Sequence, residues 1–170
     1  PNSFKIKTAY VGMPVRLEII SKSHSSYPSL GDGAPVNILI IGGSQGAKVF
    51  SDVVPSAIVK LDSVWRDRLF ITQQCREEDL EKVRKLYRSF DIKVELSTFF
   101  SDLPKLLAAS HLLIGRSGAS TVAEVMTIGR PSILVPYPYA VDDHQTANAE
   151  AVNAIGGGWL IPEQFFTPDV

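Results

Sequence analysis

Short, strongly apolar runs recur along the chain, and a stretch with helical spacing of apolar residues follows most of them. Their branched aliphatic composition is typical of parallel strands that are covered on both faces. We expect strands at 36–42, 68–73, 92–96, 111–115, 132–137 and 157–161. We expect helices between them at 47–61, 77–90, 101–110, 119–129 and 143–156. Repeated strand–helix–strand units predict an α/β fold with a doubly wound, Rossmann-like parallel sheet.

Residues at the predicted helix ends support these boundaries. Ser101 is a suitable N-cap for the helix at 101–110, whose first turn tolerates Pro104. Gly129, with Pro131 two residues later, is typical of a helix C-terminus. The stretch 21–35 is rich in Ser, Gly and Pro and lacks apolar periodicity, so we expect it to be the most flexible segment.

Composition indicates a globular protein and argues against several functional classes. Of 170 residues, 45% are hydrophobic and 21% are charged, which is enough to build the core of one domain. The net charge of −1 gives no electrostatic basis for binding nucleic acid. A single cysteine, Cys75, indicates a reducing, cytoplasmic compartment, and no apolar stretch approaches the roughly 20 residues that span a bilayer. Because the chain starts at Pro1 and stops abruptly after FFTPDV, we expect a piece of a longer protein.

A glycine-rich turn, GGSQGAK at 42–48, follows the first strong strand and opens a helix. Glycine lets the backbone approach a ligand, the helix start offers unpaired N–H groups to a phosphate, and Ser44 adds a hydroxyl donor. The turn lacks the spacing of G-x-x-x-x-G-K-[ST] and of G-x-G-x-x-G, and Asp62 follows a helix rather than a strand. These departures argue against an ATPase and against a dehydrogenase. A tight turn shaped only by packing remains the alternative.

A second glycine turn, GRSGAST at 115–121, also joins a predicted strand to a helix. If the two strands are neighbours, both helix N-termini point into one crevice, an arrangement that suits a diphosphate. Glu124 lies one helical turn further on, where its carboxylate is able to accept hydrogen bonds from both hydroxyls of a ribose. Thr121 and Glu124 also fit a capping box, and the pattern alone does not separate these two interpretations.

The stretch DDHQTANA at 142–149 begins the next predicted helix near the same edge of the sheet. Its His144, Gln145 and Asn148 supply donors and acceptors that suit sugar hydroxyls. His144 is also a candidate general base, although a lone histidine is more often structural. No D-x-D motif and no His/Cys cluster accompanies the paired aspartates of this stretch, so we expect no metal ion and no cofactor.

Two further candidates lie outside these motifs. Arg16, in VGMPVR, is either a bidentate phosphate ligand or a surface residue at a domain join. The pair Phe99 and Phe100 follows a strand end, where an aromatic wall or a main-chain contact for a nucleobase is expected; their alternative role is in the core or on its flank.

Taken in this order, VGMPVR, GGSQGA, RSGASTVAE and DDHQTANA resemble the donor-binding half of the MurG family, from about Val11 to Ile161. Members of that family transfer GlcNAc from UDP-GlcNAc to lipid I, which makes lipid II for peptidoglycan synthesis. The resemblance implies one half of a GT-B glycosyltransferase. Within it, 36–170 would be the nucleotide-sugar-binding domain, truncated at its C-terminus, and 1–35 an interdomain segment and lead-in.

The same resemblance implies what the rest of such an enzyme supplies. The lipid I acceptor site, the catalytic base and the membrane-facing patch would lie in the other half. The full-length protein would be peripheral on the cytoplasmic face of the bacterial inner membrane. This chain alone would bind the donor without catalysing transfer.

The resemblance implies contacts with each part of the substrate. The diphosphate would meet Arg16 and Ser44, and Gln45 beside Ser44 would also bind the substrate. The phosphates and the sugar would lie against Ala119, Ser120 and Thr121, and the ribose would be held by Glu124. The GlcNAc hydroxyls would be selected by Gln145 and Asn148, with His144 standing where family members often carry glutamine. The uracil would meet Phe99 and the backbone of Phe100.

Two other functions stay open at this point. One is a different GT-B enzyme that uses UDP-sugars, such as a UDP-GlcNAc 2-epimerase. The other is a non-catalytic, Rossmann-type nucleotide-binding module. Preference for UDP-sugars would support the glycosyltransferase or the epimerase, whereas binding of NAD would favour the module.

Overall fold

A sheet of six parallel strands forms the centre of the molecule, in the order β3-β2-β1-β4-β5-β6. The computed structural model describes residues 9, 11–31, 33–43 and 47–170. Its strands are β1 (Val36–Ile41), β2 (Leu69–Gln74), β3 (Lys93–Ser97), β4 (Leu112–Gly115), β5 (Ser132–Leu134) and β6 (Gly158–Leu160). The predicted fold class is therefore confirmed, and each of the six predicted strands is present.

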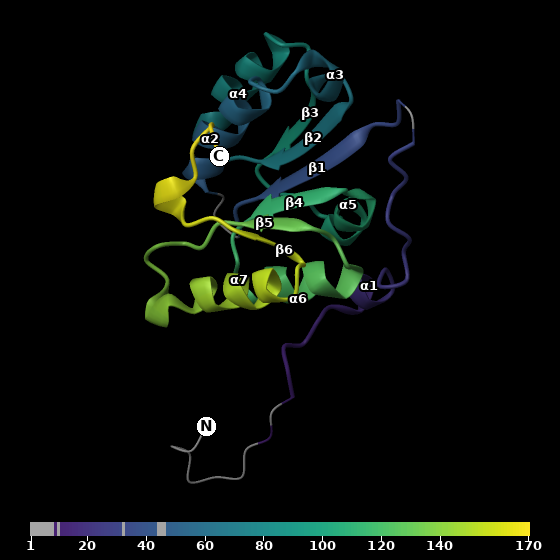
Figure 1. The fold of residues 1–170 in the computed structure, drawn as a ribbon, viewed down its shortest axis with the longest axis vertical. Helices are drawn as coiled ribbons and strands as arrows, with labels where there is room; N and C mark the ends of the chain where they lie inside the picture. The colour runs from purple at the N-terminus through teal and green to yellow at the C-terminus, as the bar shows by residue number, and fades with distance from the viewer. Residues whose placement is uncertain (1–8, 10, 32, 44–46) are drawn as a thin grey trace.

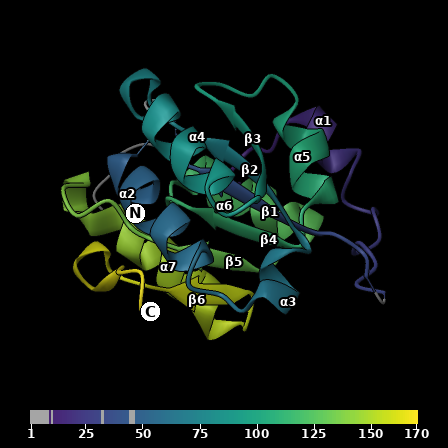
Figure 2. The same cartoon turned by 90° about the horizontal axis from the view of Figure 1, so that it is seen from above.

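Helices cover both faces of this sheet, as Figures 1 and 2 show from two directions. Two of them, α2 (Lys48–Ile58) and α4 (Leu80–Arg88), pack on one face around Phe50 and Tyr87. The opposite face carries α1 (Leu17–Ile20), α5 (Leu103–Ala109) and α6 (Ala119–Ile128), which enclose a second core. The last long helix, α7 (His144–Ala154), packs beside α6 and against β6. All five predicted helices are present.

Several short elements were not predicted, because they carry too few residues to show a periodic pattern. They are α1, α3 (Ser63–Arg66) and two 3₁₀ turns, η2 (Val141–Asp143) and η3 (Glu163–Phe165). The helix predicted at 77–90 begins as a 3₁₀ turn, η1 (Glu77–Asp79), and continues as α4. Strand β5 is also shorter than the predicted 132–137. Its pairing continues only to the amide of Val135, which donates to the carbonyl of Gly115, since the following Pro136 has no N–H.

Helix ends follow the predicted logic with two corrections. The N-cap of α5 is Asp102 and not Ser101, because the Asp102 carboxylate accepts from the backbone N–H of Lys105 at 3.4 Å. The capping-box interpretation of Thr121 and Glu124 is wrong, since α6 begins earlier and its N-cap is Gly118. The expected C-terminus of α6 at Gly129 is confirmed, with a left-handed φ of 72°.

The segment 21–35, predicted to be the most flexible, is instead fastened to the body at several points. Arg130 donates to the carbonyls of Ser25 and Ser26 and stacks on Tyr27, whose hydroxyl donates to the carbonyl of His111. Nearer the start of β1, Arg68 donates to carbonyls of residues 30, 31 and 34. These contacts bring the chain along the flank of the sheet and leave Arg16, upstream, close to α6.

Candidate functional site

The two glycine turns lie side by side at the carboxyl edge of the sheet. Strands β1 and β4 are neighbours, and their last residues, Ile41 and Gly115, face one another in the register. Gly115 permits this approach, because a Cβ there would lie 3.0 Å from the carbonyl oxygen of Ile41. Strand order reverses direction between β1 and β4, which is where open α/β sheets bind their ligands. The prediction that both turns open onto one crevice is confirmed.

Both helices that start at this point lack a side-chain cap. The N-caps are Ala47 for α2 and Gly118 for α6, and neither makes a side-chain hydrogen bond to its helix. The N–H of Phe50, in the first turn of α2, donates to the carbonyl of Ala47, and no N-cap side chain takes up the remaining first-turn N–H groups of either helix. The helix dipoles favour an anion at this position. Gly43, near the start of the first glycine turn, has a left-handed φ of 84°, which favours glycine over residues with a side chain, and a Cβ on it would meet no atom within 4 Å.

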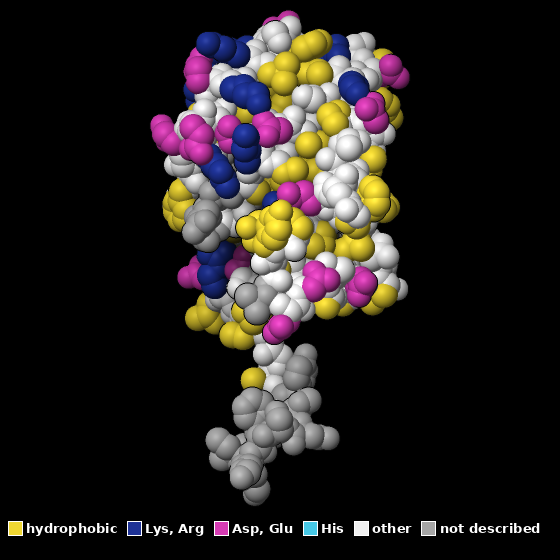
Figure 3. All heavy atoms as spheres, turned by 90° about the vertical axis from the view of Figure 1, so that its left-hand side faces the viewer, with side chains coloured by type: hydrophobic (Ala, Val, Ile, Leu, Met, Phe, Trp, Pro, Cys, Tyr) yellow, Lys and Arg dark blue, Asp and Glu magenta, His cyan; other side chains and the backbone are white. Residues whose placement is uncertain are grey.

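Two adjoining cavities occupy this edge. The first, called here the Phe100 cavity, has a volume of about 480 Å³ and is lined by Arg16, Gln74, Phe99, Phe100, Ser120 and Glu124, among others. The second, the Gln145 cavity, has about 470 Å³ and is lined by Lys48, Arg76, Arg116, Tyr137, Gln145 and Glu163, among others. Gly43 and Thr121 line both, so the glycine turns separate two compartments of one site. Figure 3 looks onto this edge and shows basic, acidic and hydrophobic side chains intermixed.

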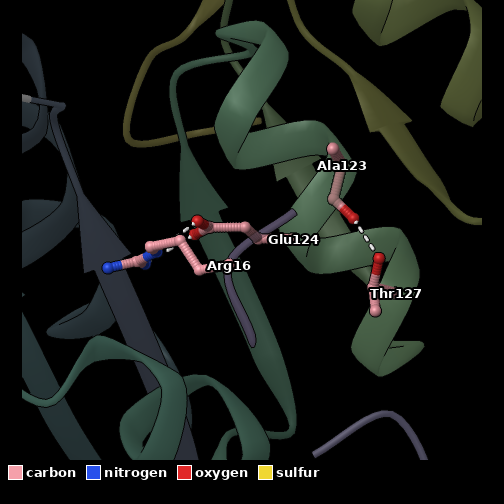
Figure 4. A network of polar contacts seen from close by, with 4 residues as sticks. All are labelled: Arg16, Ala123, Glu124 and Thr127. Carbon is pink, nitrogen blue, oxygen red and sulfur yellow. Dashed lines mark hydrogen bonds and ion pairs between the residues drawn. The ribbon is translucent and has the colours of Figure 1, made fainter. Parts of the chain in front are cut away.

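Arg16 and Glu124, predicted to bind different parts of a nucleotide, bind each other (Figure 4). The guanidinium donates from Nε to Oε1 at 2.8 Å and from Nη2 to Oε2 at 3.0 Å. Glu124 is the enclosed partner, with its side chain 11% exposed against 50% for Arg16. The hydrogen bonds to the carboxylate raise the pKa of Arg16. This bidentate pair forms one wall of the Phe100 cavity.

The aromatic pair lies in the turn after β3 and lines the same cavity as Arg16 and Glu124. Phe99 is 74% exposed and Phe100 is half-buried. Sequence reasoning missed the residue that places this turn, Gln74 at the end of β2. Its Oε1 accepts from the N–H of Gly42 at 3.1 Å, and its Nε2 donates to the carbonyl of Thr98 at 3.1 Å. Gln74 thereby fastens the first glycine turn to the aromatic turn; a polar residue ending an apolar strand was the available signal.

The predicted residues at the start of α6 divide between the compartments. Ala119 and Ser120 are exposed, and Ser120 lines the Phe100 cavity. Thr121 lines both cavities, as Gly43 of the other turn does.

The first turn of α7 closes the Gln145 cavity. Gln145 lines it, with its Oε1 accepting from the backbone N–H of Tyr137 at 3.0 Å. Asn148 does not line it, and its Nδ2 donates to the carbonyl of Ser117 at 2.9 Å. His144 is exposed at the first position of the helix. Preceding it, Asp143 adopts a left-handed φ of 51°, a conformation that costs backbone energy in a residue other than glycine.

Arg116 and Glu163 were not predicted, yet both line the Gln145 cavity. The Arg116 guanidinium lies over the rings of Phe50 and Tyr137, donates to the carbonyls of Val135 and Pro136, and pairs with Glu163 at 2.5 Å. Glu163 comes from η3, where the chain returns across α2. Because all these partners are far apart in sequence, no local pattern indicates them.

Two predicted residues, Ser44 and Gln45, lie outside the described residues. Among residues 9, 11–31, 33–43 and 47–170, no three His, Cys, Asp or Glu side chains come together in the way that holds a metal ion. Within the same described part, none of the helices has the length and apolar character needed to cross a membrane.

Comparison with known proteins shows which family has this sequence. The model of the glycosyltransferase family 28 C-terminal domain matches residues 37–170. Two relatives, from Paramagnetospirillum magneticum and Rhodospirillum rubrum, are 51% and 52% identical over 163 and 158 residues. Both are named UDP-N-acetylglucosamine–N-acetylmuramyl-(pentapeptide) pyrophosphoryl-undecaprenol N-acetylglucosamine transferase. The matched regions cover 96% and 93% of this chain but only 44% and 41% of the relatives.

A solved structure agrees with these sequences. The crystal structure of Acinetobacter baumannii MurG superposes with a TM-score of 0.78 at 33% identity, covering 99% of this chain and 47% of that one. A glycosyltransferase of kitacinnamycin, at 20% identity and a TM-score of 0.63, shares the fold. The chain belongs to the glycosyltransferase family 28 C-terminal domain family.

Proposed function

We propose that this chain is the donor-binding half of the glycosyltransferase that transfers GlcNAc from UDP-GlcNAc to lipid I, forming lipid II. The observation that carries the proposal is the pair of uncapped helix N-termini at the ends of β1 and β4, between two adjoining cavities. A diphosphate needs the positive ends of the helices, and a nucleotide-sugar needs a compartment on either side of it. The names of the relatives supply the identity of the nucleotide-sugar.

In this proposal the Phe100 cavity takes the nucleoside. Glu124 accepts hydrogen bonds from the ribose hydroxyls, and uracil lies beside Phe99 against the backbone of Phe100. The diphosphate lies between Gly43 and Thr121, in contact with Ala119, Ser120 and the turn that holds Ser44 and Gln45. The sugar enters the Gln145 cavity, where the Gln145 side chain meets its hydroxyls. His144, one residue before Gln145, and Asn148, one helical turn after it, would reach the sugar from the edge of this cavity.

Arg16 then has two partners in succession. Without a ligand it neutralises Glu124, and its half-exposed side chain is free to turn at small cost. A diphosphate carries more negative charge than one carboxylate, so it draws Arg16 away and leaves both Glu124 oxygens to the ribose. The binding of the two halves of the nucleotide is in this way coupled through one ion pair.

The chemistry follows from where charge develops. The acceptor hydroxyl attacks the anomeric carbon of GlcNAc with inversion, and UDP departs with added negative charge on its diphosphate. Two helix N-termini and Arg16 stabilise that charge where it develops. The acceptor, the general base and the contact with the inner membrane are supplied by the part of the relatives that this chain does not span. Residues 1–35 serve as the join to that part and 36–170 as the donor domain.

Calorimetric titration of UDP-GlcNAc, UDP, ATP and NAD into the purified chain tests the proposal. We expect binding of UDP and UDP-GlcNAc, no binding of NAD, and no transfer to a lipid I analogue. Binding of NAD, or of none of these ligands, would support a nucleotide-binding or docking module instead. Release of free epimerised sugar without an acceptor would identify an epimerase.

A further inference from the structure

The backbone N–H of Tyr137 sets the orientation of the Gln145 side chain. Its carboxamide meets the backbone N–H of Tyr137 at 3.0 Å, and a backbone N–H donates and never accepts. The atom facing Tyr137 must therefore be Oε1, and the NH₂ group is the end left for the cavity that Gln145 lines. The usual ambiguity between the oxygen and the nitrogen of an amide is absent here.

One buried residue fixes the helical turn that carries Gln145. Ser117, fully buried in the second glycine turn, donates from Oγ to the carbonyl oxygen of Gln145 at 2.8 Å. The carbonyl of the same serine accepts from Nδ2 of Asn148 at 2.9 Å. Ser117 thus holds α7 at two positions one turn apart, which sets both the height and the rotation of the helix relative to the glycine turn.

The neighbouring residue fixes the other partner of Gln145. Arg116 donates to the carbonyls of Val135 and Pro136 at 3.1 and 3.0 Å and lies over the ring of Tyr137. Its pairing with Glu163 holds the guanidinium in that position. Because Arg116 makes all these contacts within the protein, we expect it to affect the cavity indirectly. It fixes the position of the Tyr137 N–H, and that N–H orients the side chain of Gln145.

We propose that Ser117, assisted by Arg116, is a positioning residue that makes Gln145 a hydrogen-bond donor toward the sugar and so determines which sugar the site prefers. This inference rests on the proposed function, because it assumes that the Gln145 cavity holds the sugar of a UDP-sugar. Under it, the second glycine turn does more than approach the diphosphate: two of its side chains orient the group that distinguishes one sugar from another.

The test compares the affinities of UDP and UDP-GlcNAc in variants of the purified chain. In Ser117→Ala we expect UDP to bind as before, while the advantage of UDP-GlcNAc over UDP falls by about five- to tenfold, since one hydrogen bond no longer holds α7 in place. Discrimination against UDP-GalNAc and UDP-glucose should fall with it. Parallel losses for UDP and UDP-GlcNAc, or an unchanged ratio, would show that Ser117 is merely structural and would overturn the proposal.

A matched control is Ser110→Ala. Ser110 is also buried and also donates from Oγ to a carbonyl, that of Leu107 at 2.8 Å, but it precedes β4 and lines neither cavity of the site. Its replacement should lower the melting temperature without changing the ratio of the two affinities.

A second variant keeps the proposal testable if Ser117→Ala does not fold. Gln145→Glu retains an oxygen for the N–H of Tyr137 and replaces the NH₂ by a second acceptor. We expect it to bind UDP and to lose the advantage of UDP-GlcNAc, whereas Asn153→Asp, at an exposed position of the same helix, should retain it. A preserved advantage in Gln145→Glu would contradict the donor role. If the unmodified chain binds neither UDP nor UDP-GlcNAc, the proposed function itself fails.

Discussion

Arg16 and Glu124 are 108 residues apart in sequence and form a bidentate ion pair on one wall of the Phe100 cavity. Arg16 belongs to the segment before the sheet and Glu124 to the second turn of α6. Because Arg16 is half exposed, the pair contributes at most about 1 kcal/mol to the stability of the fold. The ion pair should have a larger effect on the affinity of ligands that bind to Arg16 or to Glu124 in place of the other residue.

Replacement of Glu124 should therefore affect binding much more than folding. In Glu124→Ala we expect the affinity for UDP to fall by about tenfold to a hundredfold, the range for a lost hydrogen bond to a charged group. The midpoint of urea unfolding should change little. Titration calorimetry checks this, with Glu150→Ala, an exposed acid on α7, as the control. Equal UDP affinity in Glu124→Ala and the unmodified chain would remove Glu124 from the site.

Replacement of Arg16 should separate nucleoside from nucleotide. In Arg16→Ala no ion pair with Glu124 has to break before Glu124 binds the ribose. The affinity of this variant for uridine should therefore equal or exceed that of the unmodified chain. UDP should bind several-fold more weakly, because its diphosphate loses a cation. Both constants come from the same titration series. A parallel loss for uridine and UDP would mean that Arg16 only supports the local fold.

Gln74 should be required to hold the aromatic turn near the first glycine turn. Gln74→Leu has a similar size but leaves the half-buried N–H of Gly42 and the carbonyl of Thr98 without the Gln74 side chain as a partner. We expect a loss of about 1–3 kcal/mol in the free energy of unfolding, together with weaker UDP binding. Gln74→Glu tests the acceptor alone, because it keeps an oxygen toward Gly42. Unchanged UDP affinity in Gln74→Leu would show that the two turns need no bridge.

The fold was predictable because its signals are local. Several strands contain continuous apolar runs, such as Ile38–Ile41 in β1 and Leu112–Ile114 in β4, and the long helices have their own end signals, such as Gly129 after α6. The glycine turns were predictable as a site for the same reason, since each follows a strand and opens a helix. The order of the strands completes the inference, because it places the ends of β1 and β4 together.

What the sequence did not show depends on contacts between distant segments. Arg116 carries no pattern that indicates its contacts with Phe50, Tyr137 and Glu163, which gather from three separate parts of the chain. The segment 21–35 looked flexible because it is polar, yet arginines elsewhere hold its carbonyls. For Glu124, the local sequence suggested a capping box, whereas its partner in the structure is Arg16, which is distant in sequence and is brought near only by the fold.

Tyr87 gives the core a defined pH dependence. Its hydroxyl is buried and donates to Oε1 of Gln73 at 2.8 Å, and burial raises its pKa. Below pH 9 both folded and unfolded chains keep the phenol proton, so its contribution is intact. Above about pH 10 the unfolded chain releases the proton and the folded chain does not, so stability falls by about 1.4 kcal/mol per pH unit.

Urea unfolding at pH 8 and pH 10.5 measures this dependence. Tyr87→Phe should be less stable at pH 8, because Gln73 loses its partner, and should lose less stability than the unmodified chain at pH 10.5. Equal losses in the two proteins would assign the alkaline instability to other groups.

The central claim, that UDP-GlcNAc binds at the carboxyl edge between the two glycine turns, is tested most directly by mapping amide chemical shifts. Titration of UDP-GlcNAc into the ¹⁵N-labelled chain should perturb the amides of Gly43, Gly118, Thr121 and Tyr137 and those of the turn after β3. The opposite edge offers a separate cavity of about 480 Å³, lined by Gly33, Arg68 and Lys93, among others. Shifts confined to that opposite cavity, with the glycine turns unaffected, would contradict the account.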